Sequence, residues 1–238
     1  MNRTTLGWIA IGGLGLGAAC LSLAYALGGR SFDDLRLGFL LGPACHGDGK
    51  AKQREARLAW DDGDAVELAL PATVYWRGGE GSDVIVRGLP DLVAHVEVRG
   101  GRITLNCRGG SGARNLELTL PGRIFRRIAI SGSGKLVMEN MNQPELALSI
   151  SGSGSGSMRA QGAVDRAKIT VTGSGHANLG DLVVKQLTLT ISGSGKVEAN
   201  PRDSADINIA GSGDVRLLGR PANLRTSVAG SGRITSVP

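Results

Sequence analysis

The chain has 238 residues, of which 38 are glycine and only 3% are aromatic, and its formal net charge is +6. This length suffices for one or two domains, but a compact enzyme core of this size normally contains more large aromatic side chains. The excess of basic residues favours anionic partners such as acidic glycans or lipid headgroups. It does not favour nucleic acid, because the basic residues are not interleaved with aromatic residues that stack on bases.

The first 27 residues are predicted to form a hydrophobic helix. Residues 6–27 are 22 positions without a charged side chain, and as a helix they would extend about 33 Å, enough to cross a hydrocarbon core of about 30 Å. Ala24-Tyr25-Ala26 fits the small-x-small rule for signal peptide cleavage. A cleaved signal peptide and an uncleaved transmembrane anchor therefore both stay open, and the length favours the anchor. Either one exports the rest of the chain.

Residues 28–57 are predicted to be a linker, which ends in a polar and basic stretch at 47–57. The stretch is interpreted as a solvated tether, and attraction to anionic headgroups is the alternative. Cys45 lies in this segment and could pair with Cys107 in an exported chain. However, Cys107 continues an alternation of apolar residues, so a buried free thiol is an equally open interpretation.

Residues 58–127 are predicted to be opening strands that cap one end of the region that follows. Short alternating segments are bounded by proline or glycine, as in residues 66–70 and 116–120. Gly100-Gly101 lies between Val96–Val98 and Ile103–Leu105, which indicates a β-hairpin. Because no stretch here has helical periodicity, no helix is predicted.

Residues 128–238 contain an internal repeat of the triplet Gly-Ser-Gly. The triplets end at Gly134, Gly156, Gly175, Gly195, Gly213 and Gly232, at intervals of 22, 19, 20, 18 and 19 residues. A period near 20 is typical of a solenoid of stacked coils rather than of a globular domain. Glycine suits a sharp corner that needs positive φ or close approach of the chain.

Two apolar residues spaced by one precede the triplets, and another apolar residue follows two positions after them. This spacing places the side chains on one face of a strand, directed inward. The pairs before the triplets are Ile128 and Ile130, Leu148 and Ile150, Ile169 and Val171, Leu189 and Ile191, and Ile207 and Ile209. The pattern predicts an all-β parallel β-helix with a polar return in each coil. The second corner segment, Ser151–Ser157, is two residues longer than the other corners. Aligning it with them on Gly156 predicts a bulge at that corner.

The order of these segments resembles the head GIN domain family, described as heads of putative autotransporter adhesins. The resemblance covers residues 62–238 and rests on Asp62-Gly63-Asp64, on the alternation at 66–70, on residues 96–105 and 116–121, and on Ile128-Ala129-Ile130-Ser131-Gly132-Ser133-Gly134. It implies a right-handed β-helix of pectin-lyase-like shape, export, no known catalytic residues and a role in adhesion. Autotransporters end in a membrane-inserted domain, whereas no strands of that kind precede Pro238, so we expect surface attachment through the N-terminus.

The glycine motifs do not predict a cofactor. Gly132-Ser133-Gly134-Lys135 looks like part of a phosphate-binding loop, but Leu136 follows the lysine and no helix pattern begins there. A polysaccharide-modifying enzyme on this fold would need Asp or Glu at matching positions of neighbouring coils, and no such column forms. We therefore predict no catalytic residue, no cofactor and no metal site.

The residue directly after each corner is predicted to face outward. These residues are Lys135, Ser157, His176, Lys196, Asp214 and Arg233. Lys135, Lys196 and Arg233 would line a basic edge, interpreted either as solubilising charges or as contacts to an anionic glycan or cell-surface component.

The sequence therefore predicts a non-enzymatic adhesion or surface-binding head. We expect it in the bacterial cell envelope, either anchored in the inner membrane and facing the periplasm or exported to the surface. Two alternatives stay open: a polysaccharide-modifying β-helix enzyme, and a structural or regulatory envelope protein that forms homo-oligomers through its coil ends.

Overall fold

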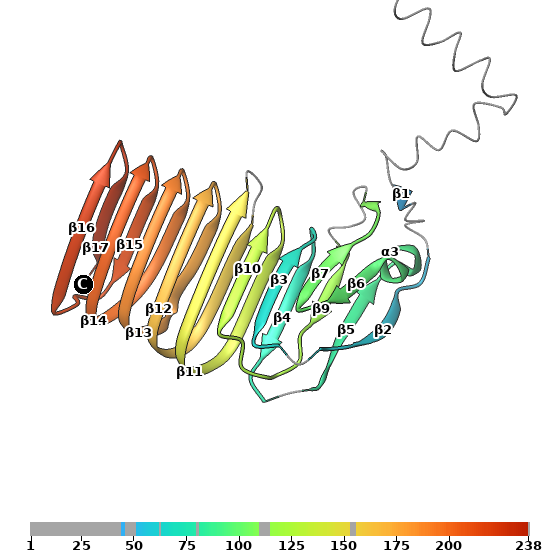
Figure 1. Ribbon diagram of the computed structural model, residues 1–238. Coiled ribbons are helices and arrows are strands. Elements are labelled where there is room, and N and C mark those ends of the chain that lie inside the picture. The colour runs from blue at the N-terminus through green and yellow to red at the C-terminus, as the bar shows by residue number, and fades with distance from the viewer. Residues whose placement is uncertain are drawn as a thin grey trace, which may run out of the picture. The chain divides into compact units, whose positions relative to one another are not determined.

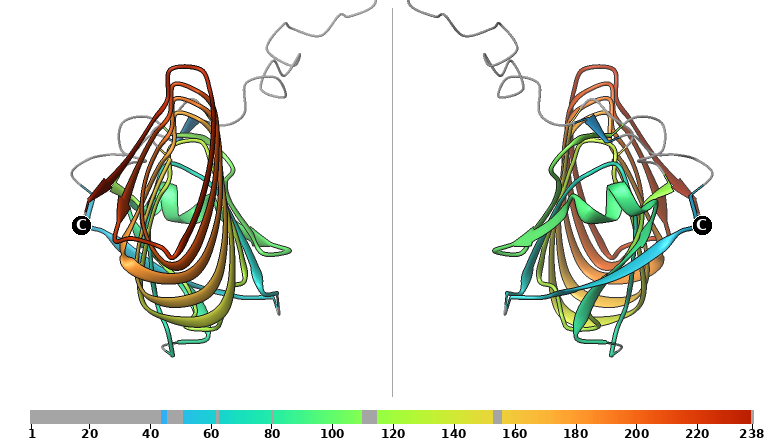
Figure 2. Two further views of the ribbon diagram at one scale, coloured as in Figure 1. Left: turned by 90° about the vertical axis from the view of Figure 1, so that its left-hand side faces the viewer. Right: turned by 90° about the vertical axis from the view of Figure 1, so that its right-hand side faces the viewer.

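The computed structural model describes residues 44–45, 51–61, 63–79, 81–109, 115–152 and 156–237. These residues form an all-β solenoid of about five turns. Figure 1 shows the coils stacked in a row, with strands in a front and a back layer, and Figure 2 shows the same stack from its two ends. The predicted all-β solenoid is confirmed, whereas its right-handed sense and pectin-lyase-like shape stay predictions.

The predicted hydrophobic helix at residues 1–27 lies outside the described residues, as does most of the predicted linker at 28–57. In the described part of the chain, no helix is long and apolar enough to cross a membrane. The compact unit begins at Pro43. It includes β1 (Ala44–Cys45) and β2 (Arg54–Ala59), so the head begins before the expected boundary at residue 58.

Each coil of the repeat region has two opposite faces, joined by a Gly-Ser-Gly corner at one edge and by a bend at the other. We call the strand segments that follow a corner face A, and the segments that lead into the next corner face B. The long strands that run from one corner around the bend to the next are β11 (Lys135–Gly152), β12 (Ser157–Gly173), β13 (His176–Gly193) and β14 (Lys196–Gly211). The expected polar return is therefore not a loop but part of the strand, with a shift in register at the bend.

The last turns are shorter strands that continue the two faces. They are β15 (Asp214–Leu218), β16 (Asn223–Ala229) and β17 (Arg233–Val237). β16 extends face B beside β14, and β17 extends face A beside β15, both in parallel.

The interior consists of aliphatic columns that run along the solenoid. In face B, Ile128 pairs with Leu148 and Leu148 with Ile169, and these side chains are buried. In face A, Leu136 pairs with Met158, which pairs with Ala177. The inward direction predicted from the spacing is confirmed. One coil buries little apolar surface, so the stack as a whole supplies the hydrophobic stabilisation.

The two glycines of a corner have different tasks. Gly193, the first of its triplet, has φ +124°, a conformation that L side chains rarely adopt. Gly195, the third, has ordinary φ, but a β-carbon there would lie 2.5 Å from Cγ1 of Val171 in the preceding coil. The corner therefore needs one glycine for its turn and one for close packing.

The longer second corner keeps its neighbours in register. Gly152 pairs with Gly173 before the corner, and Met158 pairs with Leu136 and Ala177 after it. This confirms the alignment on Gly156. The two extra residues fall within 153–155, which lie outside the described residues.

The stack begins earlier than the repeated triplets indicate. β3 (Ala65–Ala69) pairs in parallel with β10 (Arg127–Ser131), and β4 (Thr73–Arg77) pairs in parallel with β11. These two strands form a coil whose corner, residues 70–72, is Leu-Pro-Ala instead of Gly-Ser-Gly. The stacked coils therefore begin before residue 128, within the segment for which the sequence predicts opening strands and a cap.

Residues 78–126 leave this coil, build the cap and return. The cap elements are β5 (Asp83–Gly88), α3 (Pro90–Ala94), β6 (Val96–Arg99), β7 (Arg102–Leu105), β8 (Arg108–Gly109) and β9 (Glu117–Thr119). The predicted hairpin is confirmed, since Val98 lies opposite Ile103 in an antiparallel pair. The expectation of no helix is wrong for α3, whose five residues are too short to show a period.

The cap is connected to the N-terminal strands β1 and β2 by strand pairing and by a disulfide. β5 pairs antiparallel with both β2 and β9, which ends the parallel stack on that side. Cys45 and Cys107 form a disulfide with their Cα atoms 5.6 Å apart. Of the two alternatives left open by the sequence, the structure has the disulfide.

Candidate ligand-binding grooves

The outward column predicted after the corners is present on face A. Lys135 pairs with Ser157, and the pairing continues through His176, Lys196 and Asp214 to Arg233. All of these side chains are exposed except Ser157, which is half-buried. Lys135 lies three coils from Lys196, about 14 Å at the usual spacing of parallel strands.

Two of the three predicted basic residues share one hollow. Lys196 and Arg233 line a surface depression of about 430 Å³ together with His176, Asp214 and Arg216. Asp214 stands between the two cations in the column, and Arg216 has a carboxylate partner in Glu198 at 3.9 Å. The predicted basic edge is therefore interrupted, with Lys135 separate from the hollow.

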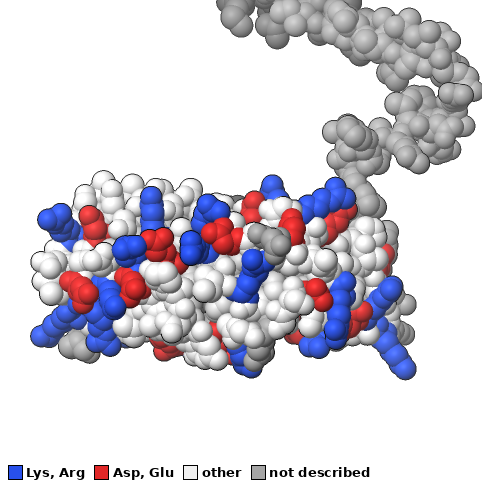
Figure 3. All heavy atoms as spheres, turned by 60° about the horizontal axis from the view of Figure 1, so that its bottom comes forward, with Lys and Arg blue, Asp and Glu red and all other residues white. Residues whose placement is uncertain are grey.

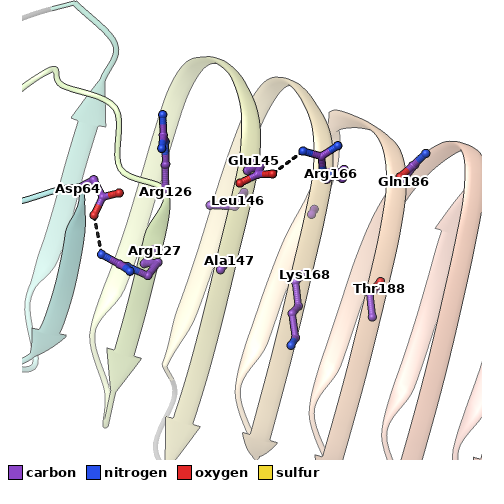
Figure 4. A pocket seen from close by; sticks show the side chains of 11 residues that line it. Asp64, Arg126, Arg127, Glu145, Leu146, Ala147, Arg166, Lys168, Gln186 and Thr188 are labelled. Atoms are coloured by element: carbon purple, nitrogen blue, oxygen red, sulfur yellow. Dashed lines mark hydrogen bonds and ion pairs between the residues drawn. The ribbon is translucent and has the colours of Figure 1, made fainter.

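A second basic site, on face B, was not predicted. A groove of about 470 Å³ crosses neighbouring coils there, and Figure 4 shows the side chains that line it. Its lining residues are Asp64, Arg126, Arg127, Glu145, Leu146, Ala147, Arg166, Ala167, Lys168, Gln186 and Thr188. We call it the face B groove.

The groove arises from one small residue between two long ones. Arg127, Ala147, Lys168 and Thr188 pair in succession across four strands. Ala147 is too short to fill the space between the arginine and the lysine, so a notch remains between them. The repeat thus fixes the spacing of the cations, and the alanine makes the hollow.

The groove contains more positive than negative charge. Four cationic and two acidic side chains line it. Arg127 pairs with Asp64 at 2.7 Å, and Arg166 donates a hydrogen bond to Glu145. No ion pair within the described part of the chain involves Arg126 or Lys168, so these two cations are free to meet a ligand.

The Glu145–Arg166 pair keeps both groups ionised. The hydrogen bond and the positive charge of Arg166 lower the pKa of Glu145, and Arg126 lowers it further to a smaller extent. The same contact raises the pKa of Arg166. A carboxylate held in this way is poorly suited to act as a general acid near neutral pH.

A second hollow continues the groove toward the corners. It also measures about 470 Å³ and shares Arg127, Ala147 and Lys168 with the first. The rest of its lining includes the hydroxyl groups of Ser149 and Thr170, apolar residues, and Glu67, whose carboxylate pairs with Arg102 at 3.2 Å. A ligand along face B would therefore meet cations at one side, and hydroxyl groups with one ion-paired carboxylate at the other.

The sequence carried a signal for this groove. The residues directly before the inward pairs align at coil spacing as Arg127, Ala147, Lys168, Thr188 and Asp206. The sequence-based prediction aligned only the residues after the corners. Elsewhere, acidic and basic side chains are interspersed on the surface that Figure 3 shows, so positive charge alone does not mark a site.

The fold is a parallel β-solenoid with exposed grooves on both of its faces. Residues 64–221 match the family described as "Putative auto-transporter adhesin, head GIN domain". Because the match covers more than half of the chain, the chain belongs to this family, as the resemblance implied.

Solved structures share the fold. The crystal structure of a putative adhesin from Bacteroides fragilis NCTC 9343 has a TM-score of 0.62 at 16% identity, over 78% of this chain and 97% of that chain. That of a putative lipid binding protein from Parabacteroides distasonis ATCC 8503 has a TM-score of 0.50 at 20% identity, over 81% of this chain and 98% of that chain. At these identities the similarity shows the fold alone. A comparison with curated proteins finds no match.

Proposed function

We propose that the solenoid is a non-enzymatic adhesion head that binds an anionic linear polymer, such as a carboxylated or sulfated glycan, in the face B groove. The observation that carries the proposal is the notch at Ala147 between Arg127 and Lys168, beside Arg126, which forms no ion pair with any described residue. The two carboxylates of the groove are already neutralised by arginines. A ligand with several negative charges therefore gains contacts without displacing the existing ion pairs.

The extent of the groove favours a polymer over a small anion. Its column of outward residues spans four strands, about 14 Å at the usual strand spacing. Exposed cations at such spacing give little affinity one at a time, so several regularly spaced anionic groups are needed to hold the ligand. The hydroxyl-lined continuation offers hydrogen-bond partners for sugar hydroxyls.

The proposed place of action is the bacterial cell envelope, with the head exported and held by an N-terminal anchor. Three observations support it: the family description as an adhesin head, the charge-free segment at residues 6–27, and the Cys45–Cys107 disulfide. Disulfides persist mainly in exported proteins.

The test is retention of the full chain, in a neutral detergent, on immobilised dextran sulfate, polygalacturonate and uncharged dextran. The decisive variant is Arg126→Ser/Lys168→Ser, because neither side chain has an ion pair to lose among the residues that the structure describes. Its control is Arg202→Ser/Arg220→Ser, which removes the same charge from exposed positions outside the grooves. The triple variant Lys135→Ser/Lys196→Ser/Arg233→Ser examines the face A edge.

We expect the wild type to bind the two anionic polymers in a salt-dependent manner and not the uncharged one. Affinity should fall at least five-fold in Arg126→Ser/Lys168→Ser and less than two-fold in the control. Equal losses of affinity in both double variants would show that binding depends only on the net charge of the protein, and this would overturn the proposal. A loss confined to the triple variant would place the site on face A instead.

A second candidate function, self-association, is supported by the last coil. Within the described strands, β16 pairs only with β14 and β17 only with β15, so the outer edge of both is open (Figure 1). Leu224 and Val228 on β16 are each 44% exposed. An open edge with apolar side chains is a template for another strand.

A second copy fits this edge by symmetry. If two β16 strands pair antiparallel about Thr226, then Leu224 lies opposite Val228 of the other copy, and Arg225 lies opposite Ser227. Thr226 on β16 is five residues before the corner serine Ser231, and Thr235 on β17 is four residues after it. Because these two separations along the chain are nearly equal, one two-fold axis can relate the β16 strands on face B and the β17 strands on face A.

Position-specific cross-linking tests this end-to-end dimer. A cysteine at Thr226 would lie opposite its own copy at 4.5–5.5 Å between Cα atoms, within the range for a disulfide. In a Cys20→Ser background, Thr226→Cys should give dimers upon oxidation, and the exposed corner variant Ser194→Cys should not. The further substitution Val228→Lys in the Thr226→Cys protein should suppress the cross-link. Equal cross-linking at both positions would reject the dimer.

A further inference from the structure

The cap brings together three side chains that the proposed function does not use. Cys45, His95 and Cys107 each offer one ligand atom, and these atoms all lie within 4.8 Å of one another. Cys45 is buried and the other two are half-buried. The residues come from β1, from the end of α3 and from the segment between β7 and β8.

The backbone holds these three segments in place. The backbone N–H of Asn106, next to Cys107, donates to the carbonyl of His95 at 2.9 Å. The N–H of His95 donates to the carbonyl of Leu92 at 3.1 Å. Cys45 pairs with Gly109 in the parallel β1–β8 bridge. The cluster is therefore supported by hydrogen bonds that do not depend on the side chains themselves.

The hydrogen bond of His95 leaves one of its two ring nitrogens for a ligand. Its Nδ1 lies 2.7 Å from the carbonyl oxygen of Asp91, and a carbonyl only accepts, so the proton resides on Nδ1. The lone pair is then on Nε2. Histidines that bind metals commonly donate their other ring N–H to a carbonyl or carboxylate in this way. The Asp91 carboxylate, 3.8 Å from Nδ1, reinforces that tautomer.

We propose that reduction of the Cys45–Cys107 disulfide turns this cluster into a Cys2His site for Zn²⁺, with a fourth position open to water. Two thiolates and an imidazole are a donor set that zinc prefers. Reduction by an external dithiol transfers two electrons and two protons to the cystine, giving two thiols and leaving the dithiol as its own disulfide. Zinc binding then releases the two thiol protons.

Disulfide and zinc site would perform the same mechanical task in different surroundings. Either one connects β1 to the cap beside β8. In an oxidising compartment the covalent bond makes the connection, and in a reducing one the metal replaces it. Strand β1 therefore stays connected to the cap in an oxidising compartment and in a reducing one.

The experiment is Co²⁺ titration of the full chain in a Cys20→Ser background, reduced with a phosphine that is not itself a thiol. Cobalt bound by thiolates shows intense charge-transfer absorption in the near ultraviolet together with visible d–d bands. His95→Gln removes one proposed ligand and leaves both cysteines. His176→Gln changes an exposed histidine of face A and serves as the matched control.

We expect the reduced wild type to bind one Co²⁺ that Zn²⁺ displaces, and the oxidised protein to bind none. Affinity should fall at least ten-fold in His95→Gln and stay unchanged in His176→Gln. Absence of thiolate–cobalt bands in the reduced protein would overturn the proposal. So would equal affinity of the wild type and His95→Gln. The oxidised His95→Gln variant, examined by circular dichroism, verifies that the cap still folds.

Discussion

A β-carbon on Gly213 would lie 2.7 Å from Cγ2 of Ile191, the last inward-facing residue of the preceding coil. Real β-carbons do not approach other atoms so closely, so the coil spacing depends on this glycine. We expect Gly213→Ala to lower the free energy of unfolding by about 1–3 kcal/mol, the usual cost of overpacking a core. Denaturant unfolding followed by circular dichroism measures it.

The control for that substitution is Gly63→Ala. The nearest atom to a β-carbon on Gly63 is 3.8 Å away, which is ordinary contact, and the backbone there is not left-handed. Its unfolding free energy should change by no more than about 0.5 kcal/mol. If the two variants were equally stable, close packing at the corner would not set the coil spacing.

Gln143 provides the second prediction, because its buried side-chain amide donates hydrogen bonds to two backbone carbonyls at the bend of the first long coil. Its Nε2 donates to the carbonyls of Phe125 at 3.0 Å and Glu145 at 2.6 Å, and the side chain is buried. Gln143→Leu would leave both carbonyls without this donor and should cost about 1–3 kcal/mol of unfolding free energy. Thermal and denaturant unfolding measure the loss.

Gln161 is the matched control, since it is an exposed glutamine in β12. Gln161→Leu should change stability by no more than about 0.5 kcal/mol. A loss in Gln161→Leu as large as that in Gln143→Leu would mean that the buried hydrogen bonds are not the cause.

The repeated corners made most of the fold predictable. Each Gly-Ser-Gly fixes where a coil turns, and the period-two spacing of residues such as Ile169 and Val171 fixes which side chains face inward. Register between coils follows from aligning the triplets, as the pairing of Gly173 with Gly193 shows. The sequence therefore contained the columns, including the outward column that ends at Arg233.

The cap and the face B groove were harder to predict, for two physical reasons. The corner at residues 70–72 uses Leu-Pro-Ala, so the coil of β3 and β4 lacked the signature of the others. The chain also leaves that coil after β4, forms the cap, and returns to the stack at β10. Local periodicity describes single strands and does not predict which strands become neighbours after so long an insertion. The groove depends on the absence of a side chain at Ala147, which a search for charged residues overlooks.

The Cys45–Cys107 disulfide leads to the third prediction. It joins residues separated by 62 positions, and the loop that it closes contains most of the cap. Cross-links of this kind typically stabilise by about 2–4 kcal/mol, mainly by restricting the unfolded chain. We expect the Cys45→Ser/Cys107→Ser variant to lose that amount of unfolding free energy, measured with a metal chelator present.

Reduction of the wild type in the same chelator should reproduce the loss. The two routes remove the same bond, whereas serine substitution also changes the side chains. Unfolding midpoints that do not respond to reductant would show that the Cys45–Cys107 disulfide adds little to the stability of the head.

The fourth prediction concerns the pH at which the face B groove changes its charge. The hydrogen bond and the charge of Arg166 lower the pKa of Glu145, so the folded protein binds this proton less readily than the unfolded chain does. The ion pair therefore stabilises the fold above the unfolded pKa, and this contribution is lost as pH falls through the lower folded value. Carboxyl NMR should place the titration of Glu145 below that of an ordinary glutamate.

Arg166→Gln should move that titration up toward the ordinary value, because both the hydrogen bond and the nearby charge are removed. Protonation of Glu145 takes one negative charge from the groove, so retention on dextran sulfate, whose sulfates stay ionised, should strengthen as this group titrates. Glu145→Gln should lack that step. An unchanged Glu145 titration in Arg166→Gln would show that the arginine does not control the charge of the groove.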